Sequence, residues 1–313
     1  MTAGGSMDAA HAAAVIQAIA SGFRDQLRAP ILKTPAIAGL AYEDVTFPSE
    51  DGVPLEAWFV PRAGSNKLLI VNHPRGFNRY GFPSHIEPWR SVGAMGGNDF
   101  EVDFIADLRI LHDAGFNVLT YDLRNHGHSG SGNGSLVTSG RYESRDVIGS
   151  LVFARSRPDI RDMAIGLFSR CMGCNATIFA IARKPEMFLD VRCLVGVQPV
   201  SPRVILSRIL SLAGVAPDHM KELDERVRLV TSFGLDDLTP IPAAADVHLP
   251  TFLYQVHDDV MTVPADVEAI FENIGTSRKE LFWIEGTKRR WDGYTYFTRH
   301  PEKMLAWFNH YMG

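Results

Sequence analysis

The sequence predicts an α/β fold, a mostly parallel, twisted sheet with helices on both faces and a small helical cap. Short, nearly continuous apolar runs recur along the chain, as is typical of strands buried on both faces of a parallel sheet. Segments with helical periodicity separate these runs, and a hairpin precedes the first of them. An antiparallel hairpin followed by repeated strand and helix units favours an open α/β sheet.

The expected elements follow one another in a regular order. After a first helix at about 8–27, the stretches "EDVTFPSEDG" and "PLEAWFVPR" predict the hairpin, with its turn at Asp51 and Gly52. The parallel strands are expected at 67–74, 116–124, 163–169, 192–200, 251–258 and 280–286. The helices are expected at 104–114, 145–156, 175–184, 265–274 and 301–312.

The length of 313 residues suits one large domain. We expect an N-terminal helical segment at 1–41 and the α/β domain at 42–313. About fifty residues separate the strands that end near 200 and begin near 251, more than a simple connection needs. Residues 201–238 have a helical pattern, so a cap insertion is predicted at about 201–245.

The net charge and the hydropathy pattern exclude some classes of binding partner. The net charge of −5 gives no basic footprint for nucleic acid or an anionic membrane, so a small-molecule substrate or a protein partner is favoured. The aromatic run at 291–297 favours a substrate of hydrophobic or aromatic character. The alanine-rich run at 9–20 is a poor signal peptide and too short for a membrane span. The sequence leaves open whether the protein forms a homo-oligomer.

The 3 cysteines of the chain favour a reducing compartment, and a cytoplasmic location is expected. Cys171 and Cys174 form a C-x-x-C pair, but no second pair of Cys or His residues completes a zinc site. No metal and no cofactor is therefore predicted.

The stretch "IGLFSRCMGC" carries the strongest chemical signal. Cys171 directly follows a predicted strand and precedes a predicted helix, with the small residues Ser169 and Gly173 on either side. A tight turn from strand to helix needs small residues two positions before and after an exposed nucleophile. Cys171 is therefore the candidate nucleophile, although a lone cysteine more often packs in a core.

These residues resemble the nucleophile elbow of the α/β-hydrolase family, G-x-S-x-G, with Cys171 in the serine position. Further motifs follow in the family's order: "NHPRGF" resembles its oxyanion loop, "YDLRNHGHSG" its D-x-R-G-x-G-x-S segment, and "HDDVMTVP" its acid loop. The resemblance runs from about residue 42 to the end of the chain. It implies an α/β-hydrolase fold with a cysteine nucleophile, as in dienelactone hydrolases.

The resemblance also implies the roles of other residues. Asp259 is the acid, with Asp258 as the alternative register. The backbone N–H of Met172 donates to the oxyanion, together with the N–H of Arg75 or Phe77, because Pro74 has no N–H.

The expected catalytic histidine is missing. The loop after the last strand reads "IEGTKRRWDGYTYF", and His300 comes too late in the chain to replace it. His257, beside the acid loop, is a candidate base. A cation at the old histidine position, Arg290 above all, is the other candidate, because a thiolate is stabilised by a helix N-terminus and a nearby cation.

Polar and aromatic residues near these motifs are the candidate substrate pocket: His73, Arg170, Arg289, Trp291 and Tyr294. The aromatic run at 291–297 either walls this pocket or packs beneath the final helix. His126 and His128 are expected to shape a turn at its rim.

The first functional hypothesis is a cysteine-dependent acyl hydrolase or acyltransferase. Thioesters, lactones and activated esters suit such a site better than amides, because no acid for a poor leaving group is evident. The alternatives are a non-hydrolytic enzyme on the same scaffold (a cyclase, isomerase, dehydratase or C–C lyase) and a catalytically silent ligand-binding protein. A fold alone does not choose among them.

Overall fold

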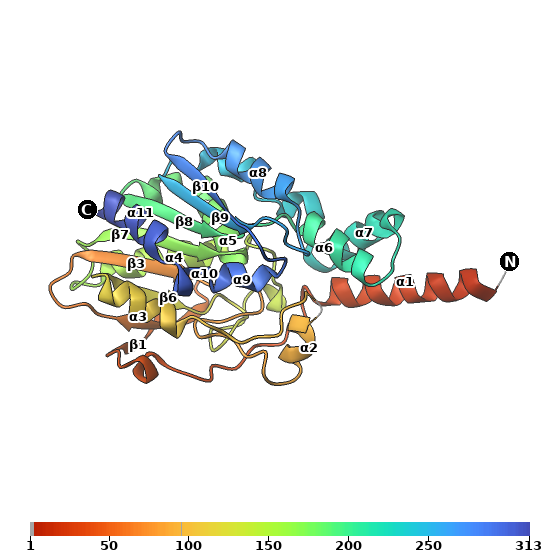
Figure 1. The fold of residues 1–313 in the computed structure, drawn as a ribbon, viewed down its shortest axis with the longest axis horizontal. Helices are drawn as coiled ribbons and strands as arrows, with labels where there is room; N and C mark the ends of the chain where they lie inside the picture. Colours follow the sequence, from red (N-terminus) through yellow and green to blue (C-terminus); the bar gives the residue numbers. More distant parts are fainter. Residues whose placement is uncertain (1–2, 95) are drawn as a thin grey trace.

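The central sheet confirms the expected α/β class (Figure 1). The computed structural model describes residues 3–94 and 96–313, and its main sheet has eight strands in the order β1-β2-β6-β3-β7-β8-β9-β10. The hairpin of β1 (Glu43–Pro48) and β2 (Pro54–Val60) is antiparallel, and β2 pairs antiparallel with β6 (Asn117–Tyr121). The other neighbours are parallel: β3 (Lys67–Asn72), β7 (Ala164–Arg170), β8 (Val191–Val197), β9 (Thr251–Val256) and β10 (Lys279–Ile284).

Helices cover both faces of this sheet, as the buried runs predict. One face packs on α4 (Ser144–Ser156), α5 (Met172–Arg183) and α8 (Pro264–Asn273), and the other on α3 (Ile105–Asp113) and α11 (Glu302–Met312). In β3, Leu68 and Ile70 join the first core, whereas Leu69 and Val71 join the second. Among the described residues, none of the helices combines the length and hydropathy that a membrane span needs.

Shorter elements fill the connections. They are η1 (Pro35–Ala38), the antiparallel ribbon of β4 (Gly81–Phe82) and β5 (Val102–Asp103), α2 (Trp89–Ala94), η2 (Asn133–Ser135), η3 (Pro185–Phe188), α9 (Arg290–Tyr294) and α10 (Tyr296–Arg299).

The region of the expected cap is helical. It contains α6 (Pro202–Leu212), η4 (Pro217–His219), α7 (Met220–Thr231), η5 (Leu235–Leu238) and η6 (Pro242–Asp246). The N-terminal helix α1 (Ala3–Ser21) packs against α6 and α7, where Ile16, Leu210 and Val227 share one apolar cluster. Figure 1 shows α1 running beside α7, away from the sheet. The N-terminal helix thus packs together with the helices between β8 and β9.

The prediction that the first helix continues to residue 27 is wrong. The helix ends at Ser21, and residues 22–25 form turns. After the helix end, backbone carbonyl groups accept hydrogen bonds from loops that are distant in the sequence. Phe23 O accepts from Val137 N at 2.7 Å, and Ala29 O accepts from Asn78 Nδ2 at 2.8 Å. Tertiary hydrogen bonds therefore replace the helical ones that local propensity favours.

Candidate functional site

Cys171 lies on a sharp turn between β7 and α5. Its N–H extends the strand ladder by donating to Val197 O at 2.7 Å, and its C=O already accepts from Asn175 N at 2.9 Å. The backbone of Cys171 has φ 48° and ψ −114°, a strained conformation for a residue with a side chain. This is the geometry that the elbow motif predicts.

The small neighbours of Cys171 bring the helix against the end of β3. A Cβ on Gly173 would lie 2.7 Å from Asn72 Cβ and 2.8 Å from His73 O, so a larger residue would push the two elements apart. The Ser169 hydroxyl is buried and lies 2.8 Å from both Asn72 Nδ2 and Thr177 Oγ1. The loop after β3 therefore adjoins the elbow.

A buried ion pair stands where the missing histidine would bind the acid. Arg290 Nη1 donates to Asp259 Oδ2 at 2.7 Å, and both side chains are buried, with side-chain exposures of 4% and 0%. The other donors of Arg290 reach Gln198 O at 2.7 Å and Tyr294 Oη at 2.9 Å. Asp258 instead lies at the surface, bonded to the His257 ring.

Arg290 and Tyr294 also lie close enough to Cys171 for the thiol to influence their pKa values. Burial alone would lower the pKa of Arg290, but its neighbours Tyr294, Cys171 and Asp259 raise it well above its ordinary value. Burial raises the pKa of Tyr294 well above its usual range, so its phenol stays protonated at neutral pH. The thiol of Cys171, itself 8% exposed, thus faces a permanent cation and a phenol.

Gln198, which the sequence analysis did not single out, holds Arg290 in place. Its C=O accepts from Arg290 Nη2, and its Nε2 donates to the backbone O of Arg290 at 2.5 Å. The residue directly follows β8 and has φ 50°, which is uncommon outside glycine. Its position at the carboxyl end of a parallel strand is the one signal that could have pointed to it.

Two backbone N–H groups in the loop after β3, those of Arg75 and Gly76, have no acceptor among the described residues. Phe77 N donates to Pro74 O at 3.3 Å within a turn, whereas no described residue accepts from the N–H of Arg75. Burial lowers the pKa of the Arg75 guanidinium, and the charges of Glu143 and Cys171 act against this shift. Of the two expected donors, the geometry favours Arg75 beside Met172.

Both ring nitrogens of each buried histidine near the elbow are engaged in hydrogen bonds within the protein. His73 Nδ1 donates to Pro74 O at 2.7 Å, and its Nε2 accepts from Leu123 N at 2.9 Å. His126 Nδ1 donates to Arg124 O at 2.8 Å, and its Nε2 accepts from Gln26 Nε2 at 2.7 Å. Both rings are therefore neutral and orient loops, so His73 has no ring nitrogen left for a substrate.

His126 makes the stability of the protein dependent on pH. Burial, with the charges of Arg75 and Arg28, lowers the pKa of His126 to about 4. The folded state then binds fewer protons than the unfolded state between pH 4 and the ordinary histidine value, so stability is lost as pH falls through this window.

We expect His126→Gln to reduce the loss of stability that occurs as the pH falls through this window. The slope of the unfolding free energy against pH should fall by up to about 1.4 kcal/mol per pH unit, measured by urea unfolding. Burial raises the pKa of Asp107 to about 6, so Asp107 contributes a pH dependence of opposite sign. Because Asp107 is present in both the wild type and the variant, the difference between their slopes reports on His126. An unchanged slope would contradict this expectation.

Two of the expected pocket residues lie elsewhere. Arg170 is fully buried in the core, paired with Asp107 at 2.7 Å and stacked between Phe104 and Phe168. The expectation that Arg170 lines the pocket is therefore wrong, because the alternation of β7 directs its side chain into the core behind the elbow. Arg289 lies at the surface and pairs with Asp99 and Asp292.

His257, the candidate base, is also directed away from the elbow. Its ring is partly exposed, bonds to Asp258 at 2.8 Å and lies edge-on to Trp283. The hydrogen bond that His257 donates to Asp258 raises the pKa of His257. The structure thus joins His257 to its sequence neighbour and to β10 rather than to Asp259 or Cys171.

Some aromatic residues of the run at 291–297 lie near the elbow, and others pack in the core near the final helix. Trp291 and Tyr294 pack edge-on against Phe77, next to the elbow, with ring centroids 5.5 and 5.3 Å away. Phe297 instead packs between Phe168 and the final helix, as the alternative predicts. Trp291 and Tyr294 are therefore the aromatic side chains on the side of Cys171.

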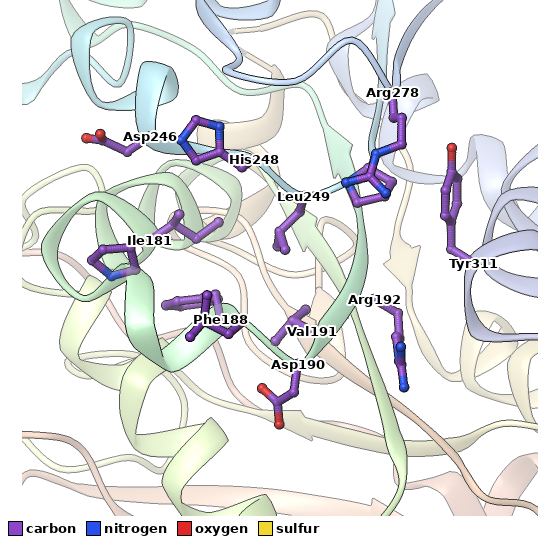
Figure 2. Close-up of a pocket in the computed structure, with 13 residues that line it drawn as sticks. Ile181, Phe188, Asp190, Val191, Arg192, Asp246, His248, Leu249, Arg278 and Tyr311 are labelled. Atoms are coloured by element: carbon purple, nitrogen blue, oxygen red, sulfur yellow. The ribbon is translucent and has the colours of Figure 1, made fainter.

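A cavity of about 390 Å³ lies at the other end of the sheet (Figure 2). Its lining comes from η3, the start of β8, the loop before β9 and the end of α11, including Phe188, Arg192, Leu249 and Tyr311. These are the amino ends of parallel strands, whereas Cys171 follows the carboxyl end of β7. The cavity is therefore separate from the elbow.

The strand order and the elbow define an α/β-hydrolase fold, and comparison with solved structures agrees. An esterase from Pyrococcus furiosus has 18% sequence identity and a TM-score of 0.67, with 93% of this chain and 100% of that chain covered. An α/β hydrolase from Penicillium has 16% identity and a TM-score of 0.59, covering 87% and 99%. A dienelactone hydrolase from Anabaena variabilis has 20% identity and a TM-score of 0.53, covering 86% and 98%. At these identities the likeness concerns the fold. Neither a protein-family model nor a curated protein sequence matches the chain.

Proposed function

We propose that the protein is a cysteine-dependent acyl hydrolase or acyltransferase for a small metabolite with an activated acyl group. The observation that carries the proposal is the Cys171 thiol at a strained elbow, against the guanidinium of Arg290. A fixed cation and a helix N-terminus both favour the thiolate form of a cysteine. The esterase and the dienelactone hydrolase with this fold support an acyl substrate.

In the first step, the Cys171 thiolate attacks the acyl carbonyl carbon and a C–S bond forms. The negative charge moves to the carbonyl oxygen, which accepts hydrogen bonds from the N–H groups of Met172 and Arg75. Collapse of this intermediate breaks the bond to the leaving group, which departs with the electron pair as a thiolate or alkoxide. The product is a thioester on Cys171.

The neighbours of the thiol restrict the leaving group. Arg290 is held as a cation, and burial keeps the phenol of Tyr294 a weak acid, so neither protonates a poor leaving group efficiently. Thioesters, lactones and activated esters leave without such help, whereas amides do not. The substrate class therefore follows from the absence of an acid beside Cys171 among the described residues.

In the second step, water or another nucleophile attacks the thioester and Cys171 leaves as a thiolate. The two buried histidines have no free ring nitrogen, so no base in this part of the described structure activates water. We therefore expect transfer to an acceptor that is itself a good nucleophile to be faster than hydrolysis.

The proposal is tested by trapping the thioester. The wild-type protein is incubated with phenyl thioacetate, and the site of acetylation is read by intact and peptide mass spectrometry. We expect one acetyl group on Cys171, and an acylation rate about tenfold lower in Arg290→Met than in the wild type at pH 7, because the cation that favours the thiolate is gone. Arg290→Lys keeps a charge and should retain more of the rate. An unmodified Cys171 in a folded wild-type protein would overturn the proposal.

A further inference from the structure

The chain between α1 and η1 reaches the candidate oxyanion loop. We call residues 22–30 the N-terminal strap. Arg28 fastens it to the loop after β6, with Nη1 donating to Ser129 O at 2.5 Å. Phe23, at 1% exposure, joins the apolar cluster of the cap. The strap thus connects the cap to the loops around the elbow.

Gln26 is the residue of the strap that joins two of these loops. Its Nε2 donates to His126 Nε2 at 2.7 Å, and its Oε1 accepts from Arg75 Nε at 3.2 Å. The direction of the first bond is fixed, because His126 Nδ1 already donates to the C=O of Arg124. One amide therefore ties the loop after β6 to the loop after β3.

The strap also holds the rest of the Arg75 side chain. Arg75 Nη2 donates to Gly22 O at 2.8 Å, and the guanidinium lies over the Phe23 ring, 4.6 Å from its centroid. A few residues on, Asn78 Nδ2 donates to Ala29 O at 2.8 Å. The candidate oxyanion loop is thus fastened to the strap at both of its ends.

We propose that Gln26 is a positioning residue for acyl transfer, which fixes Arg75 so that its backbone N–H is aimed at the oxyanion. This inference rests on the proposed function of Cys171. Gln26 makes no bond to the thiol, so it acts only on the step that develops an oxyanion. Displacing a catalytic group by about 1 Å is enough to lower a rate by up to about a hundredfold.

The test separates two reactions of the same thiol. Alkylation of Cys171 by iodoacetamide passes through no oxyanion, whereas acylation by phenyl thioacetate does. We expect Gln26→Met, which keeps the length of the side chain and removes the amide, to lower the acylation rate about tenfold and to change the alkylation rate less than about twofold. Gln26→Glu keeps the acceptor for Arg75 and loses the donor to His126, so its acylation rate should lie between that of Gln26→Met and the wild-type value.

The matched control is Gln17→Met. Gln17 lies on α1, and its amide bonds to Ser21 Oγ at 3.0 Å, away from Arg75 and His126. Both rates should stay at the wild-type values in this variant. Equal losses of acylation and alkylation in Gln26→Met, or no loss in either, would overturn the positioning role. A wild-type protein that is alkylated but never acylated overturns the proposed function instead, whatever the Gln26 variants do.

Discussion

Cys171→Ala is expected to abolish the acyl adduct and to lower acyl turnover by about a thousandfold or more, because no other described group near the elbow can form the covalent bond. The backbone donors of Met172 and Arg75 remain in the variant, so binding of the acyl compound should survive. Turnover is measured by thiophenol release from phenyl thioacetate, and the adduct by mass spectrometry.

Cys174→Ala is the matched control for this change. Cys174 lies one turn into α5 and is fully buried, and burial raises the pKa of its thiol far above the ordinary value. It therefore supplies no thiolate near neutral pH, and adduct and turnover should persist in the control. Turnover that survives in Cys171→Ala would reject covalent catalysis and favour a non-hydrolytic reaction at Arg290 and Tyr294.

Asp259→Ala is expected to destabilise the fold by about 3–5 kcal/mol, because it leaves Arg290 as a buried charge without its carboxylate. Arg290 is 4% exposed and would keep the Gln198 carbonyl and the Tyr294 hydroxyl as hydrogen-bond acceptors. The loss is measured as the change in the free energy of unfolding in urea. The alkylation rate of Cys171 should fall as well, because the cation is no longer fixed against the thiol.

Asp258→Ala provides a control of the same residue type at the adjacent position. Asp258 is exposed and, within the described part of the chain, bonds only to the His257 ring, so its loss should change stability by less than about 0.5 kcal/mol. Similar effects of the two substitutions would contradict the assignment of the ion pair as a buried structural element. Asp259→Asn, which keeps the shape of the side chain, should lie between them.

The sequence predicted the order of strands and helices because those signals are local. The apolar runs of β3 and β7 reflect burial on both faces, and their expected bounds differ from the observed ones by only a few residues. The elbow was predictable for the same reason. Ser169, Cys171 and Gly173 lie two positions apart, within five residues of the turn from β7 to α5, so their spacing alone specifies its geometry.

Tertiary structure decided which of several adjacent residues face the elbow. The sequence offers two adjacent aspartates, Asp258 and Asp259, and two adjacent arginines, Arg289 and Arg290. Only Asp259 and Arg290 form the buried ion pair. That choice depends on the path of two separate loops and on Gln198, which lies on a third. Likewise, Gln26 acquires its partners only because the strap leaves the helical path and meets loops far along the chain. The direction of a side chain and its long-range hydrogen bonds are set by packing between segments that are distant in the sequence. A pattern of neighbouring residues therefore does not predict them.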